Sequence, residues 1–154
     1  MLPSAYMTDA QMMIWGMRRQ GISQAEIGRR INISRQAVND ALKIAHEKVG
    51  SALRHAAEAN MIEVRHADPE KGILLGFSPS HGERVIITFS IRHGIQTWHY
   101  GNPKCVECSW VERCRRRLLE EAEERNILLD EEEKLPPSRL AHIIFSRVIP
   151  GLEP

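Results

Sequence analysis

The part of the chain that most restricts its fold is the segment 21–42, which reads GISQAEIGRRINISRQAVNDAL. Two helix start signals lie in this segment with a short break between them. Ser23 can cap a helix that begins at the next residue, and Glu26 completes the pattern of a capping box with it. Ser34 can cap a second helix, so only a few residues separate the two helices. This spacing is typical of a helix-turn-helix unit.

The second predicted helix has two chemically different faces. Val38, Leu42 and Ala45 recur at helical spacing and form its apolar face. Another face carries arginine and amide side chains, which pair with guanine and adenine edges in the major groove of DNA. The expected base-reading residues are Arg35, Gln36 and Asn39. The expected phosphate contacts, which position a protein without reading sequence, are Ser23, Gln24, Ser34 and Lys43.

Residues 8–50 also resemble the helix-turn-helix shared by sigma-factor region four, LuxR-type regulators and the archaeal Tfx DNA-binding proteins. The resemblance rests on the pattern Gly-apolar-Ser-x-x-Glu-Ile-(Gly/Ala)-x-x-apolar-x-apolar-Ser-x-x-x-Val, which starts at Gly21. It implies a helical DNA-binding fold with double-stranded DNA as its partner. It does not indicate which promoter is bound or whether transcription rises or falls. A helical hairpin that packs against protein is the alternative interpretation of this segment.

The 154 residues are enough for one domain or two small ones, and 42% of them are hydrophobic. No apolar run is long enough to span a bilayer, and the first residues lack the pattern of a secretory signal. We therefore expect a cytoplasmic protein without membrane contact. The net charge of +1 favours no partner by itself. Residues 8–60 carry eight basic and five acidic side chains, whereas residues 115–133 carry four and eight, so DNA binding is expected of the N-terminal part.

Hydrophobic periodicity predicts an α+β chain that begins with helices. A first helix is expected over 8–20, with Thr8 and Gln11 as a capping box and Trp15 in the core. The second helix of the helix-turn-helix should continue to about residue 60, because no proline interrupts residues 35–60. Its apolar stripe then comprises Val38, Leu42, Ala45, Val49, Ala52 and Ala56. The stripe predicts a homodimer seam or, as an equal alternative, burial on the chain's own C-terminal half.

After residue 60 the hydrophobic pattern changes from helical to alternating. The segments with this pattern are 61–66, 72–77, 84–90 and 95–100, and turn residues separate them. They predict a small antiparallel β-meander that serves as a wing, an effector pocket or a platform for a metal site. His81 and His93 lie in the predicted turns, where a histidine is a ligand or a base less often than a plain surface residue. The predicted domains are 1–60, a helix-turn-helix with a dimerisation extension, and 61–154, the sheet with a metal-binding sensor region.

Three cysteines lie within ten residues, and they are Cys105, Cys108 and Cys114. An odd, clustered set in a cytosolic chain favours a metal site over a disulfide framework. Residues 102–114 resemble the iron-sulfur loop of endonuclease III-type glycosylases and the C-terminal cysteines of RecB-like nucleases, which implies a [4Fe-4S] cluster. The glycosylase loop has a fourth cysteine where this chain has Trp98, so the adjacent His99 is the expected fourth ligand. The same four residues would suit tetrahedral zinc, which is the alternative to the favoured cluster.

Two C-terminal helices complete the predicted fold. Ser109 and Glu112 form another capping-box pattern, which predicts a helix to about Asn126 with Cys114 on its first turns. An acidic linker follows, and a last helix with one strongly apolar face is expected over 137–148. The C-terminal helices should therefore carry the cysteine-ligated metal site.

The leading hypothesis is a sequence-specific DNA-binding transcription regulator whose cysteine-ligated centre senses redox state or iron. One alternative is a zinc-stabilised adaptor that binds another protein. The other is an enzyme that processes nucleic acid, because both resemblances of the cysteine loop are to enzymes that cut or repair DNA. The sequence lacks a nuclease-like acid pair with a lysine, a phosphate-binding glycine loop and a Ser-His-Asp arrangement, so we expect no enzymatic activity.

Overall fold

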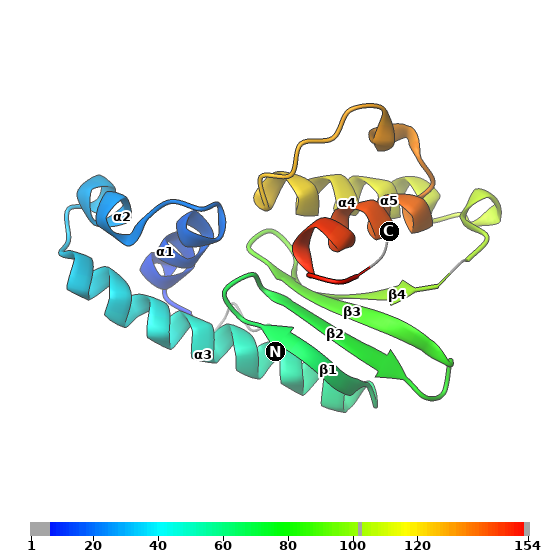
Figure 1. The fold of residues 1–154 in the computed structure, drawn as a ribbon, viewed down its shortest axis with the longest axis horizontal. Coiled ribbons are helices and arrows are strands. Elements are labelled where there is room, and N and C mark those ends of the chain that lie inside the picture. Colours follow the sequence, from blue (N-terminus) through cyan, green and yellow to red (C-terminus); the bar gives the residue numbers. More distant parts are fainter. Residues whose placement is uncertain (1–6, 102, 153–154) are drawn as a thin grey trace. The chain divides into compact units, whose positions relative to one another are not determined.

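The computed structural model describes residues 7–101 and 103–152. The chain divides into two compact units, the first ending at His99 and the second beginning at Tyr100. Within the described residues the fold is α+β, with five α-helices and one four-stranded antiparallel sheet, as predicted (Figure 1). The first unit contains α1 (Asp9–Arg19), α2 (Gln24–Ile31), α3 (Arg35–Ala59), β1 (Glu63–Asp68), β2 (Ile73–Ser78), β3 (Glu83–Ser90) and most of β4 (Gly94–Tyr100). The second contains the 3-10 turns η2 (Cys105–Glu107) and η3 (Glu131–Lys134) and the helices α4 (Val111–Glu124) and α5 (Pro137–Val148).

Side-chain caps start the first three helices where the sequence predicts them. At the start of α1, Gln11 N donates to Thr8 Oγ1 and Thr8 N donates to Gln11 Oε1, both at 3.1 Å, so this capping box is confirmed. Ser23 Oγ accepts from Glu26 N at 3.2 Å at the start of α2. Ser34 Oγ accepts from the third residue of α3 at 3.0 Å. Each cap satisfies a backbone N–H that the helix itself leaves without a partner.

The turn between α2 and α3 is tight because its residues tolerate unusual backbone geometry. Asn32 ends α2 in the left-handed conformation, with φ at 59°. Ile33 N then donates to Gly28 O at 3.0 Å. A Cβ atom on Gly28 would lie 2.7 Å from the Ile33 carbonyl oxygen, so only glycine lets the turn approach α2 this closely.

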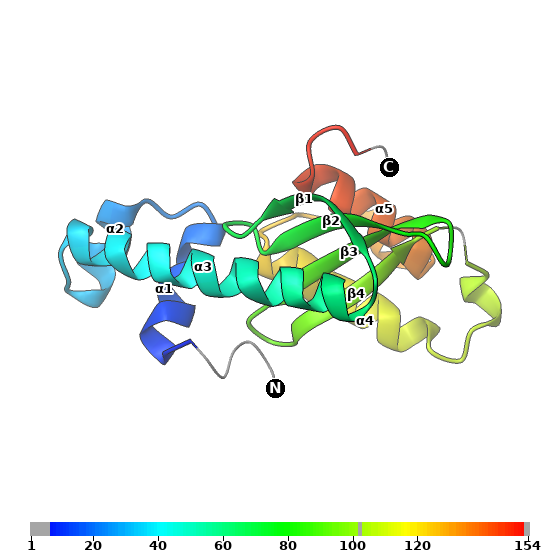
Figure 2. The same ribbon diagram turned by 90° about the horizontal axis from the view of Figure 1, so that it is seen from below.

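The apolar stripe of α3 is buried inside the first unit. In the first half of the helix, Val38 and Leu42 pack in a cluster with Ile14 of α1 and Ile27 of α2. The second half packs on the sheet, where Ala45, Val49, Leu53 and Ala57 share a cluster with Leu74, Val85, Ile87 and Phe89. Figure 2 shows α3 running along the strands. The second half of the stripe therefore packs on the sheet, in agreement with the second alternative, whereas its first half packs on α1 and α2 and its residues Ala52 and Ala56 are half-buried.

The sheet is a simple meander, which confirms the prediction from alternating hydrophobicity. Its strand order is β1-β2-β3-β4, and the pairs β1–β2 and β2–β3 are antiparallel with Leu75 opposite Ile86. A β-bulge between Val64 and His66 interrupts the pairing of the edge strand β1, which hinders pairing with another chain. Since α3 and the sheet share one core, the boundary predicted after residue 60 lies inside the first unit.

The second unit is built around the helices α4 and α5, which pack against each other. Their buried apolar residues are Leu118, Ala122, Leu140, Ala141, Ile144, Phe145 and Val148. The predicted capping box at Ser109 is wrong, because α4 begins at Val111 without a side-chain cap. Glu112 instead forms an ion pair with Arg115, one turn further along α4. None of the helices in 7–101 and 103–152 has the length and apolar character needed to cross a bilayer.

Candidate nucleic-acid interface and cysteine loop

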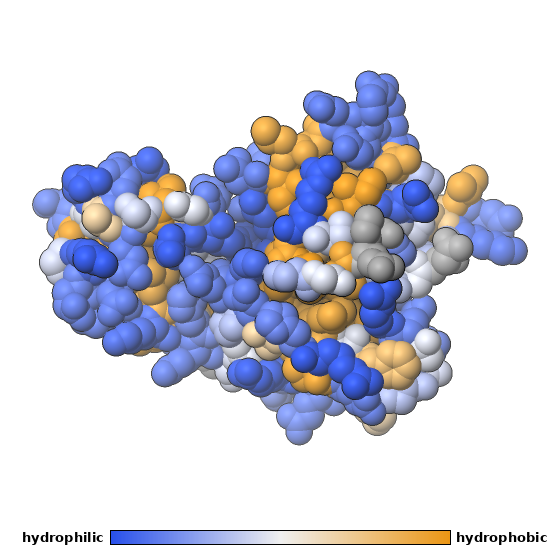
Figure 3. Space-filling view, viewed as in Figure 1, coloured by the Kyte–Doolittle hydropathy of each residue, from blue (hydrophilic) through white to orange (hydrophobic). Residues whose placement is uncertain are grey.

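The first half of α3 carries the residues predicted to read bases. Arg35, Gln36 and Lys43 are exposed on it, and Asn39 is half-buried. The apolar face predicted for the same half is buried, so the expected division of this helix into two faces is confirmed. The surface at this end of the first unit, on the left of Figure 3, is mostly hydrophilic. A polar helix face of this kind can enter the major groove.

Some polar side chains on this face already form hydrogen bonds within the protein, and others do not. Gln36 Nε2 donates a hydrogen bond to Asp40 Oδ1 at 2.9 Å, which leaves the amide oxygen and the second N–H of Gln36 for a partner. Arg35 and Lys43 form no ion pair within the described ranges. Their charges are therefore available to phosphate or to base edges.

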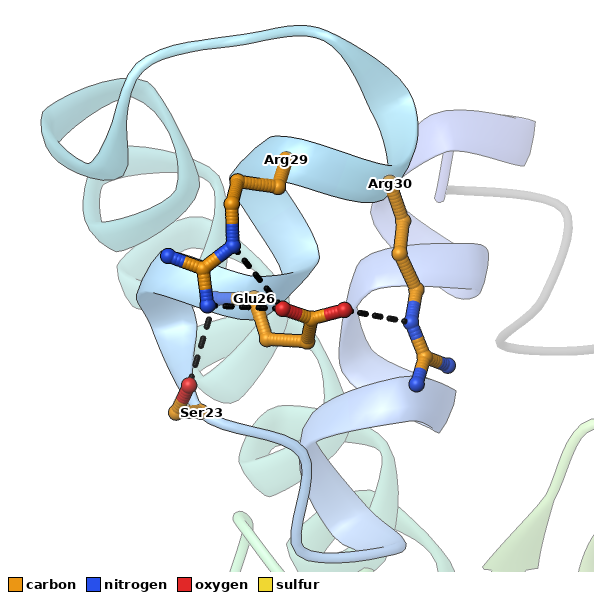
Figure 4. A network of polar contacts seen from close by, with 4 residues as sticks. All are labelled: Ser23, Glu26, Arg29 and Arg30. Carbon is orange, nitrogen blue, oxygen red and sulfur yellow. Dashed lines mark hydrogen bonds and ion pairs between the residues drawn. The ribbon is translucent and has the colours of Figure 1, made fainter.

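An ion-pair network on α2 neutralises part of the positive charge of the helix-turn-helix. Glu26 Oε2 accepts from Arg29 at 2.7 Å and 2.9 Å, and Glu26 Oε1 accepts from Arg30 at 3.2 Å (Figure 4). These hydrogen bonds, the one from Arg29 foremost, hold the pKa of the Glu26 carboxyl below its ordinary value. The capping-box pattern predicts that this carboxylate accepts a hydrogen bond from the backbone of Ser23. That part of the prediction is wrong, because the carboxylate pairs with the two arginines. The i,i+3 and i,i+4 spacing of the three residues was the signal for this network.

The cysteine loop lies at the start of the second unit. Cys108 N donates to Cys105 O at 3.0 Å across η2, and Cys114 lies in the first turn of α4 as predicted. All three thiols are free. Trp110 N donates to Cys108 Sγ at 3.4 Å. Burial raises the pKa of the Cys114 thiol, and the charges of the other two cysteines raise it further, whereas Arg117 lowers it.

This loop fits a thiolate metal site only in part. Its three thiols are the ligand type that iron-sulfur clusters and structural zinc require, and a backbone N–H to sulfur is the support that such ligands use. No group of three or more His, Cys, Asp or Glu side chains in the described ranges is arranged to hold a metal ion. Asn102, the first residue of the resemblance to the iron-sulfur loop, lies outside the described residues. A fourth ligand also has to come from outside the cysteines.

His99, the predicted fourth ligand, is engaged within the first unit. It lies on β4, and its Nδ1 forms a 2.8 Å hydrogen bond with Glu83 Oε1 of β3. Its ring centroid is 5.0 Å from that of His81 in the turn between β2 and β3. The three cysteines belong to the second unit. The sequence analysis missed this histidine pair, because only the position of β4 beside β3 reveals it.

Two of the four arginines in the segment 113–117, beside the cysteine loop, contact their own neighbours. Arg113 lies over the Trp110 ring at 4.6 Å. Arg115 pairs with Glu112 and also donates to the backbone carbonyl of Leu135 at 3.2 Å.

Comparison with family models, with characterised proteins and with solved structures finds no match to this chain. Its function must therefore be inferred from its own residues.

Proposed function

We propose that this protein is a sequence-specific regulator that binds double-stranded DNA through α3. The observation that carries the proposal is the division of the first half of α3. Its apolar residues are buried against α1 and α2, while Arg35, Gln36 and Lys43 face solvent at the start of the helix. The N-terminal turns of a recognition helix are the part that reaches base edges.

The same face argues against a hairpin that packs on protein. Between residues 34 and 43 the exposed side chains are polar except for Ala37, and the larger exposed apolar residues, Ile33 and Ile44, lie at the two ends of this face. A protein-binding helix instead presents apolar anchors at helical spacing. The continuation of α3 onto the sheet also holds the exposed half rigidly, which lowers the entropic cost of binding.

The proposal predicts two distinct effects of substitution on α3. Binding sites should first be selected from a random double-stranded DNA library with the full-length protein. Arg35→Ala or Gln36→Ala is then expected to cost about 1–3 kcal/mol at one base pair and to relax the preference there. Lys43→Ala is expected to weaken binding to all sequences and to reduce the salt slope by about 1. Fluorescence anisotropy at several salt concentrations measures both effects.

Arg54→Ala is the matched control for these variants, because Arg54 is also exposed on α3 but lies in its second half. It should bind like the wild-type protein. If Arg35→Ala and Lys43→Ala act alike, the assignment of the base-reading face is wrong. If no sequence is enriched and Arg35→Ala binds DNA like the wild type, the protein-binding alternative replaces the proposal.

We also propose that Cys105, Cys108 and Cys114 hold a metal centre through which the protein senses redox state or iron. The support is the donor set of three free thiols and the N–H directed at Cys108 Sγ. A [4Fe-4S] cluster is favoured over zinc, and such a group would supply an oxidation-sensitive link within the second unit. Most of the α3 stripe is buried, so we do not propose regulation through an α3 dimer seam.

Absorption spectroscopy and metal analysis of protein purified without oxygen test this centre. A cubane predicts a brown protein with about four irons per chain, whereas zinc predicts a colourless one with about one metal per chain. Cys108→Ala should lose the metal, and Ser109→Ala, an exposed neighbour, should keep it. A metal-free wild type would contradict the metal centre, and DNA binding that is unchanged by loss of the metal would favour the zinc-stabilised adaptor.

A further inference from the structure

We propose that His81 and His99 form a binding site for a divalent transition metal on the first unit, distinct from the cysteine loop. His81 lies in the turn that joins β2 to β3, and His99 lies near the end of β4, the strand next to β3. The chain thus brings together two imidazoles that are far apart in sequence. Both histidines are exposed, so a metal ion from solution can reach them.

The separation of the two rings matches that of two histidines on one metal ion. Their centroids are 5.0 Å apart, and their planes are inclined by 58°. Histidine nitrogen binds zinc at about 2.0–2.1 Å, so two rings on one tetrahedral ion have centroids about 5 Å apart. The two rings therefore already lie at the separation that one shared ion requires.

Hydrogen bonds engage Nδ1 of both rings, and Nε2 of each ring offers its lone pair to a metal when Nδ1 carries the proton. His99 Nδ1 meets Glu83 Oε1 at 2.8 Å, and because a carboxylate only accepts, the proton is on Nδ1 and Nε2 offers its lone pair. His81 Nδ1 lies 3.0 Å from Ser78 Oγ and 3.1 Å from Ser80 Oγ. Support of the second ring nitrogen by a carboxylate or another polar group is what orients metal-binding histidines.

The ligand type selects the class of metal. Imidazole suits zinc, copper, nickel and cobalt, whereas magnesium and calcium require oxygen ligands. Two imidazoles leave the remaining positions to water or to a group on another molecule. This composition agrees with the absence of a group of three ligands from the part of the chain that the structure describes. Glu83, whose side chain is 31% exposed, acts by orienting His99.

A cobalt titration of the full-length protein tests the site, because cobalt reports its own ligands. Cobalt bound by thiolate gives an intense charge-transfer absorption, whereas cobalt bound by imidazole and water gives only weak visible bands. We expect saturable binding of the second kind that is lost in His81→Gln and weakened about tenfold in Glu83→Gln. His66→Gln, which changes an exposed histidine on β1, should bind cobalt like the wild type.

Two outcomes would overturn the proposal. One is binding by His81→Gln that equals the wild type, and the other is loss of the thiolate absorption in His99→Gln, which would make His99 a ligand of the cysteine site. Thermal unfolding without metal checks that each variant is folded. If His99→Gln does not fold, His81→Gln alone suffices to test the site. DNA binding and the thiolate band are measured separately, so failure of this site is distinguishable from failure of the proposed function.

Discussion

Replacing Trp15 by alanine is expected to lower the free energy of unfolding of the first unit by about 3–5 kcal/mol, the usual cost of truncating a buried tryptophan. The indole is fully buried, and its Nε1 donates to Pro69 O at 3.0 Å. Its ring meets Phe89 edge to face at a centroid distance of 5.2 Å. Because Trp15 belongs to α1 and these partners belong to the sheet region, the loss weakens the join between the helical part and the sheet. A domain with about 5–15 kcal/mol of total stability would lose a large fraction of it.

Urea unfolding followed by circular dichroism measures this effect. Met13→Ala is the matched control on the same helix, because Met13 is 44% exposed and its truncation should change little. Trp15→Phe keeps most of the apolar contact and removes the indole hydrogen bond, while Pro69 O still accepts from Gly72 N at 3.3 Å, so a smaller loss of about 0.5–1.5 kcal/mol is expected. A Trp15→Ala protein as stable as Met13→Ala would show that the indole does not join α1 to the sheet.

Glu121→Ala is expected to destabilise the second unit by about 3–5 kcal/mol, because it removes one partner of a buried ion pair. The Glu121 and Arg125 side chains are 0% and 3% exposed, and Glu121 Oε2 accepts from Arg125 Nε at 3.1 Å. Without this carboxylate, a buried guanidinium loses an opposite charge at 3.1 Å. The unit is small, so a loss of this size should unfold a substantial part of the molecules.

The size of this effect should depend on charge and not on volume. Replacing both Glu121 and Arg125 by methionine removes the two charges together, so the double variant is expected to be as stable as the wild type or more stable by about 1–4 kcal/mol. Glu123→Ala, at an exposed position of α4, is the single-site control. Fluorine NMR of fluorotryptophan-labelled protein during urea unfolding follows Trp110, the tryptophan of the second unit. Equal destabilisation by Glu121→Ala and by the double variant would contradict the prediction.

Local signals predicted the first unit well because each acts over only a few residues. The caps Thr8, Ser23 and Ser34 each bind a backbone N–H three positions along the chain, and all three helices begin there. The change from helical to alternating hydrophobicity after residue 60 likewise marks the end of α3 and the start of the sheet. The exposed and buried faces of α3 followed from the same periodicity.

The sequence was less informative where one residue had two short-range partners of similar strength. Glu26 is placed equally well to cap α2 or to pair with Arg29 and Arg30, and the structure forms the ion pairs. Glu112 had the same choice, and it pairs with Arg115 while Ser109 caps nothing. Interactions on a helix surface are worth about 0.2–0.5 kcal/mol each, so such choices are settled by small differences.

The sequence by itself determined where the helices and strands begin and which side of α3 carries polar groups, because spacing along the chain decides both. Only the tertiary structure decided where the apolar stripe of α3 is buried, since a homodimer seam and a sheet require the same periodicity. It also decided that Glu121 and Arg125, which belong to the charged segment 115–133, are buried. The pairing of His99 with His81 and Glu83 likewise depends on the order of the strands, because residues far apart in sequence meet only when the sheet has formed.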